Sequence, residues 1–386
     1  MANPSLPEEF LETLTGDDSY KIPPAITSKS SLADILAFAR AQGASDVHIT
    51  ANNPISLRKF SVLNQVSNEP LGVQRIEEML KAEIPEKQFE EFQNCGDLEY
   101  VHTVPGSGRF RMTIIRQRFG TDITARIIAK NIMKFEETKM PASCKSLTQW
   151  AQGLVLVTGP SGCGKTTTLA AMIEMMNQSR QDHIITIENP IEYVFQQAQC
   201  QVTQREVGKH TLSQANALRA SLREDPDIIM VSELRDLESI QLAVTAAETG
   251  HLVFGTMNTN DAAQTISKLI FSFPADERSV ITNMVSESLR GVISQQLIPT
   301  ADGKGVVPAF EVLIVNSAIA NLIRENKFQQ INNAITIGKA AGMVLFDNSL
   351  QQLVTAGTIT GAQAFMRAIN PKLFEQYAPK AGEQHG

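Results

Sequence analysis

The sequence is poor in cysteine. Only four cysteines occur in 386 residues, they stand far apart, and none belongs to a Cys-X-X-Cys pair (Cys95, Cys144, Cys163 and Cys200). A cysteine-bound metal site or a dense disulfide framework generally shows closer or repeated spacing. We therefore interpret these residues as the reduced thiols of a cytoplasmic protein.

Long apolar runs are also lacking. No run approaches the ~20 consecutive apolar residues that a membrane-spanning helix needs. The N-terminus, MANPSLPEEFLETLTGDDSYKIPP, carries acidic residues and prolines where a signal peptide needs a basic start and an apolar stretch. We therefore expect neither a membrane helix nor a secretion signal.

Basic residues are in the minority. The chain has 34 lysines and arginines against 41 acidic residues, a formal net charge of −7, and only 6% aromatic residues. Proteins that hold nucleic acid usually carry a positive field, and those that hold single strands add aromatic residues among the basic ones. A local basic patch is compatible with these numbers, but we expect no direct binding of nucleic acid.

The composition is that of a folded chain with room for more than one domain. Hydrophobic residues make up 42% and charged residues 19% of the chain, which is typical of soluble globular proteins. A length of 386 residues is sufficient for two domains of ordinary size. Residues 1–29 are polar and contain prolines, so we expect a loosely ordered leader.

Residues 30–133 show mixed helix and strand patterns. Ser31 and Asp34 have capping-box spacing ahead of apolar residues at helical intervals, which predicts a helix start. A short strand is expected in DVHIT, a second helix in VQRIEEMLKAEI, and two strands on either side of a turn at Phe119–Thr121. This segment is predicted to be a small α+β domain.

Apolar runs alternate with helical segments from residue 153 onward. The runs are LVLVT, HIITIE, DIIMVSE, HLVFGTM and VVPAFEVLIV. Short continuous apolar strands between helices predict an α/β core with a mostly parallel sheet, which we place at residues 153–316. We expect a linker and an opening helix at 134–152 and a helical region at 317–386.

A glycine-rich stretch in this second domain predicts nucleotide binding. Residues 159–166, GPSGCGKT, fit G-x-x-x-x-G-K-[ST] and lie between an apolar strand and a helical pattern. Glycines let backbone N–H groups turn toward phosphate oxygens, and the helix start adds its positive dipole end. We expect Lys165 to reach the β- and γ-phosphates of ATP and Thr166 to ligate Mg²⁺. The expected nucleotide-binding residues here are Gly159, Pro160, Ser161, Gly162, Cys163, Gly164, Lys165, Thr166 and Thr167.

Acidic residues follow two of the predicted strands. HIITIENPIEY carries Glu188 and Glu192, and DIIMVSELRD carries Glu233. Hydrolysis of ATP needs a group that orients water, and the carboxyl ends of parallel strands supply such groups. The second stretch resembles a Walker B element, although Ser232 stands where many P-loop enzymes have aspartate. We therefore expect Thr166 and Glu233 to hold Mg²⁺.

From about residue 30 onward, the chain resembles the secretion ATPases of type IV pilus and type II/IV secretion systems, most closely the PilT/PilU-like pilus retraction motors. The motifs that carry the resemblance are GASDVHI, GRFRMTIIRQRFG, GPSGCGKTTTLAAMI, HIITIENPIEYVF, QREVG, LREDPDIIMVSELRDLESI, TAAETGHLVFGTMNT and SAIANLIRE. Each motif alone is moderately specific for the family, whereas all of them together, in this order and at family-like spacing, are strong evidence for the resemblance. The resemblance implies a RecA-like P-loop core, a PAS-like N-terminal domain and C-terminal helices.

The resemblance also implies roles for single residues. Glu192 becomes the catalytic glutamate, Glu233 the Walker B glutamate, and His251 the first His-box histidine, at the nucleotide. It further implies that Arg111 and Arg126 neutralise charge on the transferred phosphoryl group. Independently of the resemblance, the same segment carries a basic face in an acidic protein, made of Arg109, Arg111, Arg116, Arg118, Arg126 and Lys130.

Several positions depart from the family pattern. Asn189 stands where the family usually has aspartate, Asn258 replaces the usual second histidine, Ser232 replaces glycine and Thr113 replaces a common asparagine. Both candidate catalytic glutamates are kept, so the expectation of an enzyme stands, while the departures leave its rate open.

The resemblance implies a Mg²⁺-dependent ATP hydrolase that drives type IV pilus retraction and twitching motility. It implies a homohexamer in the cytoplasm, peripheral to the inner membrane, that turns its domains against each other and acts on the pilus platform protein. A paralogous motor ATPase is a further expected partner. The alternatives are a related ATPase of a secretion, conjugation or pilus assembly system, a weakly active accessory paralogue, and a nucleic-acid translocase.

Overall fold

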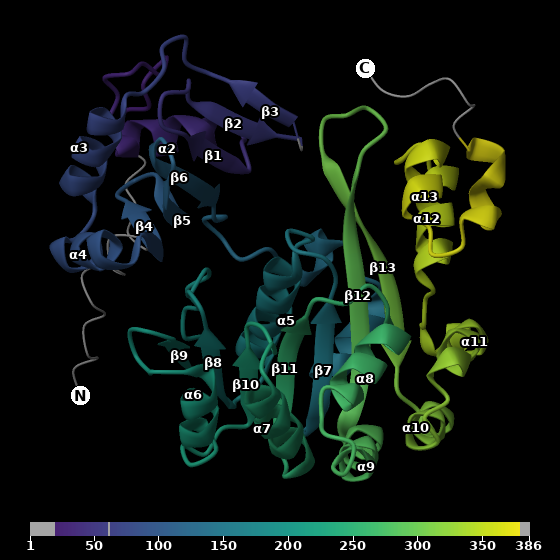
Figure 1. The fold of residues 1–386 in the computed structure, drawn as a ribbon. Coiled ribbons are helices and arrows are strands. Elements are labelled where there is room, and N and C mark those ends of the chain that lie inside the picture. The colour runs from purple at the N-terminus through teal and green to yellow at the C-terminus, as the bar shows by residue number, and fades with distance from the viewer. Residues whose placement is uncertain (1–19, 61, 379–386) are drawn as a thin grey trace. The chain divides into compact units, whose positions relative to one another are not determined.

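The computed structural model describes residues 20–60 and 62–378, and the chain divides into two compact units, Met1–Asn131 and Ile132–Gly386 (Figure 1). Residues 1–19 of the expected leader lie outside the described residues. The remainder of the leader is anchored to the first unit, because Ile26 is buried in its core and the hydroxyl of Tyr20 donates a hydrogen bond to Asp34 at 3.0 Å.

The first unit is built on one antiparallel sheet with the strand order β3-β2-β1-β6-β5-β4. Its strands are β1 (Asp46–Ile49), β2 (Ser56–Lys59), β3 (Val62–Gln65), β4 (Asp97–Val104), β5 (Gly108–Gln117) and β6 (Gly120–Ile127). Its helices are α2 (Leu32–Ala41), α3 (Val73–Glu83) and α4 (Glu86–Cys95). Apolar residues of the helices and of one sheet face form a single core, which leaves the other face to polar side chains.

The expected start of α2 is confirmed. The side chain of Ser31 accepts from the backbone of Asp34 at 3.1 Å, and the backbone of Ser31 donates to the Asp34 carboxylate at 3.2 Å. The turn between β5 and β6 also falls where the sequence predicts it. The structure adds α4 and the strands β2 to β4. The apolar patterns of α4 and β3 are weak, since Phe92 is the buried residue of α4 and β3 is exposed throughout.

The second unit contains a sheet with the order β13-β12-β7-β11-β10-β8-β9, in which every neighbouring pair is parallel except β12 and β13. The strands are β7 (Gly153–Thr158), β8 (His183–Glu188), β9 (Gln201–Glu206), β10 (Ile228–Val231), β11 (Leu252–Met257), β12 (Leu289–Pro299) and β13 (Val306–Ile314). The prediction of an α/β fold with a mostly parallel sheet is confirmed. Strands β9 and β12 went unpredicted because polar residues interrupt their apolar patterns.

Both faces of this sheet are covered. Along β7, Leu154 and Leu156 join one hydrophobic cluster, while Val155 and Val157 join another on the opposite face. The covering helices are α5 (Lys165–Ser179), α6 (Gln214–Ser221), α7 (Leu237–Glu248), α8 (Ala262–Phe271) and α9 (Arg278–Ser288). A strand buried on both faces reads as a continuous apolar run, which explains why these strands are recognisable in the sequence.

The segment ahead of β7 forms two 3₁₀ helices, η1 (Phe135–Thr138) and η2 (Ala142–Thr148), where the sequence analysis expects a linker and an opening helix. Pro141 separates them, and a proline disfavours α-helical backbone at the residue before it. The chain after β13 is helical, as expected. It contains α10 (Ser317–Arg324), η3 (Phe328–Gln330), α11 (Ile331–Ile337), η4 (Gly338–Ala341), α12 (Phe346–Thr355), α13 (Gly361–Arg367) and η5 (Pro371–Tyr377).

A buried carboxylate on β13 ties this C-terminal region to the sheet. Glu311 accepts hydrogen bonds from the backbone of Ala262 at the start of α8, at 2.8 Å, and from Phe346 at the start of α12, at 3.4 Å. Burial raises the pKa of Glu311 to about 7. One side chain thus joins the ends of two helices to one strand.

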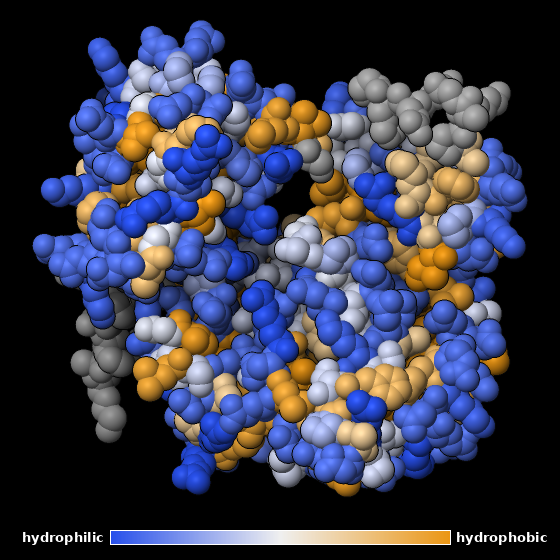
Figure 2. Space-filling model, in the orientation of Figure 1, coloured by the Kyte–Doolittle hydropathy of each residue, from blue (hydrophilic) through white to orange (hydrophobic). Residues whose placement is uncertain are grey.

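None of the helices among residues 20–60 and 62–378 combines the length and the apolar composition that crossing a bilayer requires. Figure 2 shows one face of the molecule, on which hydrophilic residues predominate and hydrophobic residues lie between them in small groups.

Candidate functional site

The glycine-rich stretch forms a tight loop between β7 and α5, at the carboxyl edge of the sheet. Gly159 has a φ of +144°, and a Cβ built there would lie 2.2 Å from the carbonyl oxygen of Gln295, so only glycine fits. Gly164, immediately before α5, has a φ of +90°. The loop therefore leads into the first turn of α5, and the unpaired backbone N–H groups at a helix start are suited to bind an anion.

The loop is braced by a side chain that the sequence analysis missed. Gln295 on β12 is 2% exposed, its Nε2 donates to the carbonyl oxygen of Cys163 at 2.6 Å, and its Oε1 accepts from the hydroxyl of Thr168 at 2.7 Å. A bulge between Leu289 and Gly291 sets the register of β12 against β7. Gln295 thereby holds both the loop, at Cys163, and the first turn of α5, at Thr168.

Lys165 connects the loop to the neighbouring strands. Its Nζ donates to the carbonyl oxygens of Gly159 at 2.8 Å and Pro160 at 3.0 Å, and to Oδ1 of Asn258 at 2.8 Å. Asn258 follows β11, and its Nδ2 donates to Oε1 of Glu233 at 2.6 Å. Burial lowers the pKa of Lys165. The structure therefore brings Lys165 and Glu233 together through Asn258.

Glu233 lies in the turn after β10. Its second oxygen, Oε2, pairs with Nη2 of Arg235 at 2.6 Å, and its backbone carbonyl accepts from Gln214 at 2.9 Å. Both carboxylate oxygens of Glu233 thus have partners, the amide of Asn258 and the guanidinium of Arg235.

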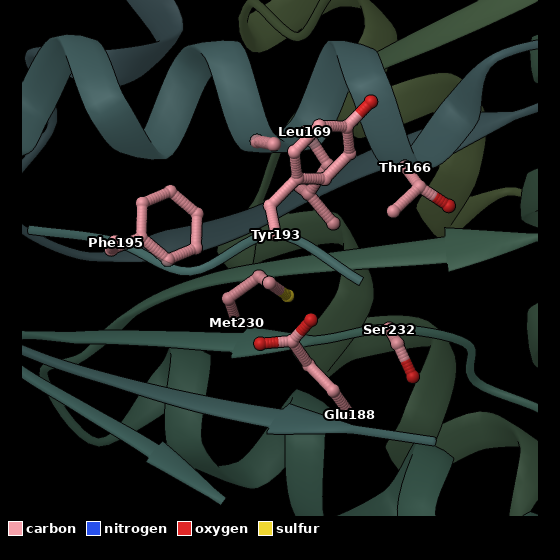
Figure 3. Close-up of a pocket in the computed structure, with 8 residues that line it drawn as sticks. Thr166, Leu169, Glu188, Tyr193, Phe195, Met230 and Ser232 are labelled. Carbon is pink, nitrogen blue, oxygen red and sulfur yellow. The ribbon is translucent and has the colours of Figure 1, made fainter. Parts of the chain in front are cut away.

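A pocket opens beside α5 (Figure 3). It is lined by Thr166, Leu169, Ala170, Glu188, Tyr193, Phe195, Met230 and Ser232. Figure 3 shows the Glu188 carboxylate pointing from β8 toward α5. Glu188 is 3% exposed and accepts hydrogen bonds from Thr186 at 2.7 Å and Gln204 at 3.0 Å. A buried, ionisable group therefore faces the helix that carries Thr166.

Glu192 lies four residues beyond Glu188, in the loop after β8, and is half-buried. The next residue, Tyr193, lines the pocket, and its hydroxyl lies 3.0 Å from Oγ1 of Thr167. Burial raises the pKa of Tyr193. The Tyr193–Thr167 contact ties the loop that carries Glu192 to the first turn of α5.

The two arginines named by the sequence analysis lie in the first unit, directly opposite each other on β5 and β6. Arg111 pairs with Glu99 at 2.5 Å, and Arg126 pairs with Asp46 at 2.9 Å. Like charges directly opposite in a sheet repel, so the two carboxylates compensate the pair. Both guanidinium groups lie on the polar face of the sheet.

His251 lies elsewhere. It precedes β11, and β11 runs parallel to β7, so His251 lies at the amino edge of the sheet whereas the loop lies at the carboxyl edge. The intervening strand, at ~3.3 Å per residue, spans about 20 Å. Its ring Nδ1 lies 3.0 Å from the carbonyl oxygen of Ala246. Within this chain, the structure does not bring His251 to the other candidate residues.

The residues around the loop suit Mg²⁺. No group of three or more histidine, cysteine, aspartate or glutamate side chains among the described residues could hold a metal ion by itself. Mg²⁺ is usually bound by one or two protein groups together with phosphate oxygens and water, rather than by a full protein cage. The Thr166 hydroxyl, the half-buried carboxylate of Glu233 and the buried carboxylate of Glu188 are donors of that kind.

The comparisons with known proteins agree with this geometry. The sequence matches the family described as type II/IV secretion system protein over residues 25–376. It is 43% identical over 343 residues to the type IV pilus retraction ATPase PilT of Pseudomonas aeruginosa, which covers 89% of this chain and 99% of that protein. It is 38% identical over 327 residues to the type IV pilus ATPase PilU of the same organism, covering 85% and 86% of the two chains.

The fold agrees as well. It is similar to a crystal structure of the pilus retraction motor PilT with bound ADP, with a TM-score of 0.80 and 39% identity over 90% of this chain and 100% of that one. The chain therefore belongs to the type II/IV secretion system protein family, as a PilT-like secretion ATPase.

Proposed function

We propose that this chain is the motor of type IV pilus retraction, and that it converts the free energy of ATP hydrolysis into movement of its two units. The observation that carries the proposal is the loop at residues 159–166, whose lysine is joined to Glu233, in a chain 43% identical to PilT over nearly its whole length. The PilT structure contains bound ADP, which supports nucleotide binding by this chain.

The loop binds the phosphates of ATP in this proposal. Backbone N–H groups at the start of α5 and the ammonium of Lys165 supply positive charge, and Thr166 and Glu233 hold Mg²⁺. When bound, Mg²⁺ neutralises charge on the phosphate oxygens. Tight packing around Gly159 and Gln295 keeps the loop in one shape, so little reorganisation is needed on binding.

The carboxylates have different roles in the proposal. Glu192 orients the attacking water and accepts its proton, because it is half-buried next to a tyrosine that contacts the loop helix. Glu233 acts on the metal side, since its carboxylate pairs with Arg235 and is linked to Lys165 through the side chain of Asn258. His251 is given no role at the phosphates.

Arg111 and Arg126 are proposed to stabilise charge that develops on the transferred phosphoryl group. Each guanidinium has an acidic partner that it could exchange for a phosphate oxygen, and arginine forms such paired contacts with either anion. ATP would then favour one pose of the units and release of phosphate another.

The assembly is proposed to be a homohexamer in the cytoplasm, peripheral to the inner membrane, acting on the platform protein of a pilus. Its similarity to PilU, a second pilus ATPase, supports co-assembly with a paralogous motor. Asn258, which replaces the family's usual second histidine, favours one further candidate, a weakly active accessory subunit.

Steady-state phosphate release from ATP by the purified protein tests the proposal. We expect hydrolysis in the presence of Mg²⁺ and its loss on chelation, with recovery when Mg²⁺ is restored. In the host strain, deletion of the gene should abolish twitching. Background hydrolysis with normal ATP binding would support the accessory subunit, and absence of nucleotide binding would contradict the proposal.

Replacing Arg111 with alanine should lower turnover by about 10²-fold or more and leave the affinity of the isolated chain for ATP nearly unchanged. The physical reason is that its charge is needed in the transition state rather than in the bound state. Phosphate release and ATP binding measured on the same preparation separate the two. Arg75→Ala, on α3 of the same unit, is the matched control. A wild-type rate for Arg111→Ala would show that Arg111 has no role in hydrolysis and serves only in its ion pair with Glu99.

A further inference from the structure

Asn258 uses both ends of its side-chain amide. Its Oδ1 accepts from the ammonium of Lys165 at 2.8 Å, and its Nδ2 donates to Oε1 of Glu233 at 2.6 Å. The two partners come from different elements, α5 and the turn after β10, and Asn258 comes from the turn after β11. The amide thus forms the link between the loop cation and the carboxylate.

The chemistry of the two partners fixes which side chains can form this link. An ammonium group only donates hydrogen bonds, and an ionised carboxylate only accepts them. The linking group must therefore accept on one side and donate on the other. A carboxamide does so at every pH, whereas an imidazole does so only when it is neutral and a carboxyl group only when it is protonated.

The surroundings of Asn258 are strongly charged. The charged and titratable groups that face it or its partners are Lys165, Glu233, Arg235, Cys163 and Lys268. Lys268 reaches it from α8, where its Nζ donates to the backbone carbonyl of Asn258 at 3.3 Å. A side chain at position 258 that gained or lost a proton would therefore alter its electrostatic interactions with both the positive and the negative groups around it.

The turns after β10 and β11 are also held together by bonds that do not involve the Asn258 side chain. The turns after β10 and β11 are joined by a backbone hydrogen bond from Leu234 to Thr256 at 2.8 Å and by a hydrogen bond from the Thr256 hydroxyl to Ser232. Asn258 itself is exposed. Substitutions at this position should leave the free energy of unfolding nearly unchanged, so their effects report on the link.

We propose that Asn258 is a positioning residue that holds Lys165 and Glu233 at a fixed separation through a link that is independent of pH. What the link serves rests on the proposed function, in which Lys165 meets the phosphates and Glu233 the metal. Because the amide has no proton to gain or lose, the arrangement of the two charged groups stays the same across the physiological range.

Two substitutions test the link by giving it opposite dependence on pH. Asn258→His supports the link only as the neutral imidazole, so its kcat relative to wild type should fall at least about fivefold from about pH 8 to about pH 6. Asn258→Asp supports it only as the protonated acid, since the charged form repels Glu233, so its relative kcat should rise over the same change. Asn258→Ala should lower kcat by a factor that does not vary with pH.

Asn260→His and Asn260→Asp are matched controls, because Asn260 is exposed in the same turn. Relative rates that stay constant with pH in both Asn258 variants, or a wild-type rate for Asn258→Ala, would overturn the proposal. A role in packing alone would not produce two opposite pH slopes.

A measurement without turnover separates this proposal from the proposed function. In a ¹⁵N NMR titration of the nucleotide-free protein, Asn258→Asp should raise the pKa of Lys165, because a carboxylate replaces the neutral acceptor. An unchanged pKa of Lys165 would show that Lys165 does not contact the side chain of residue 258. If this shift is seen but the wild type neither binds nor hydrolyses ATP, the link stands and the proposed function fails.

Discussion

Lys165→Ala should lower phosphate release by more than about 10²-fold and weaken ATP binding sharply. The ammonium is the charged side-chain group of the loop, and it lies between two loop carbonyls and Asn258, at the point where phosphate oxygens are expected. Removal of the charge leaves the backbone N–H groups of α5 as the remaining donors there. Phosphate release and binding of a fluorescent ATP analogue check the two effects.

The fold should survive this substitution, because the side chain bonds only to the loop and Asn258 and contributes to no hydrophobic cluster. Lys339→Ala, an exposed lysine on η4, serves as the control and should keep the wild-type rate. Retained turnover in Lys165→Ala, with an unchanged unfolding temperature in both variants, would exclude the loop from the mechanism.

Glu192→Gln should lower kcat by about 10²- to 10⁴-fold, because an amide cannot accept a proton from water. The substitution keeps the size of the side chain and the contact between Tyr193 and Thr167, so ATP binding should persist. The concentration of Mg²⁺ that gives half-maximal activity should also stay the same. Single-turnover hydrolysis at several Mg²⁺ concentrations measures both quantities.

Glu233→Gln provides the comparison for that result. If Glu233 acts on the metal side, the Mg²⁺ concentration that gives half-maximal activity should rise by about 10-fold or more in Glu233→Gln. The same concentration should not change in Glu192→Gln. The carboxylate of Glu233 is bonded to Asn258 and Arg235, so its loss also leaves Arg235 without that partner. The opposite pattern, with Mg²⁺ dependence changed only in Glu192→Gln, would exchange the roles of the two glutamates.

Features encoded in short stretches of sequence could be predicted. The loop with its flanking strand and helix, and the carboxylates after β8 and β10, are each encoded by one continuous stretch of sequence. The structure places the loop and these carboxylates at one edge of the sheet. The capping box at Ser31 belongs to the same class. Local patterns of this kind carry their own structural information.

Features that depend on residues far apart in the sequence could not be predicted. Gln295 braces Cys163 from 132 residues away, on a strand whose polar residues hide its apolar pattern. Asn258 attracts notice in the sequence only as a departure from a family pattern, and its link between Lys165 and Glu233 is visible only in three dimensions. The position of His251 could have been inferred from the sequence. It directly precedes the predicted strand β11, and residues that precede a strand of a parallel sheet lie at the amino edge, opposite the loop.

The bulge in β12 limits how the length of this chain can vary. Side chains alternate between the two faces of a strand, so deleting one residue between the bulge and Gln295 would turn a neighbour, Gln296, toward the loop and send Gln295 elsewhere. The turn after β12, at residues 300–305, supports no part of the site. Related chains should therefore tolerate insertions and deletions in that turn and reject them along the preceding stretch of strand.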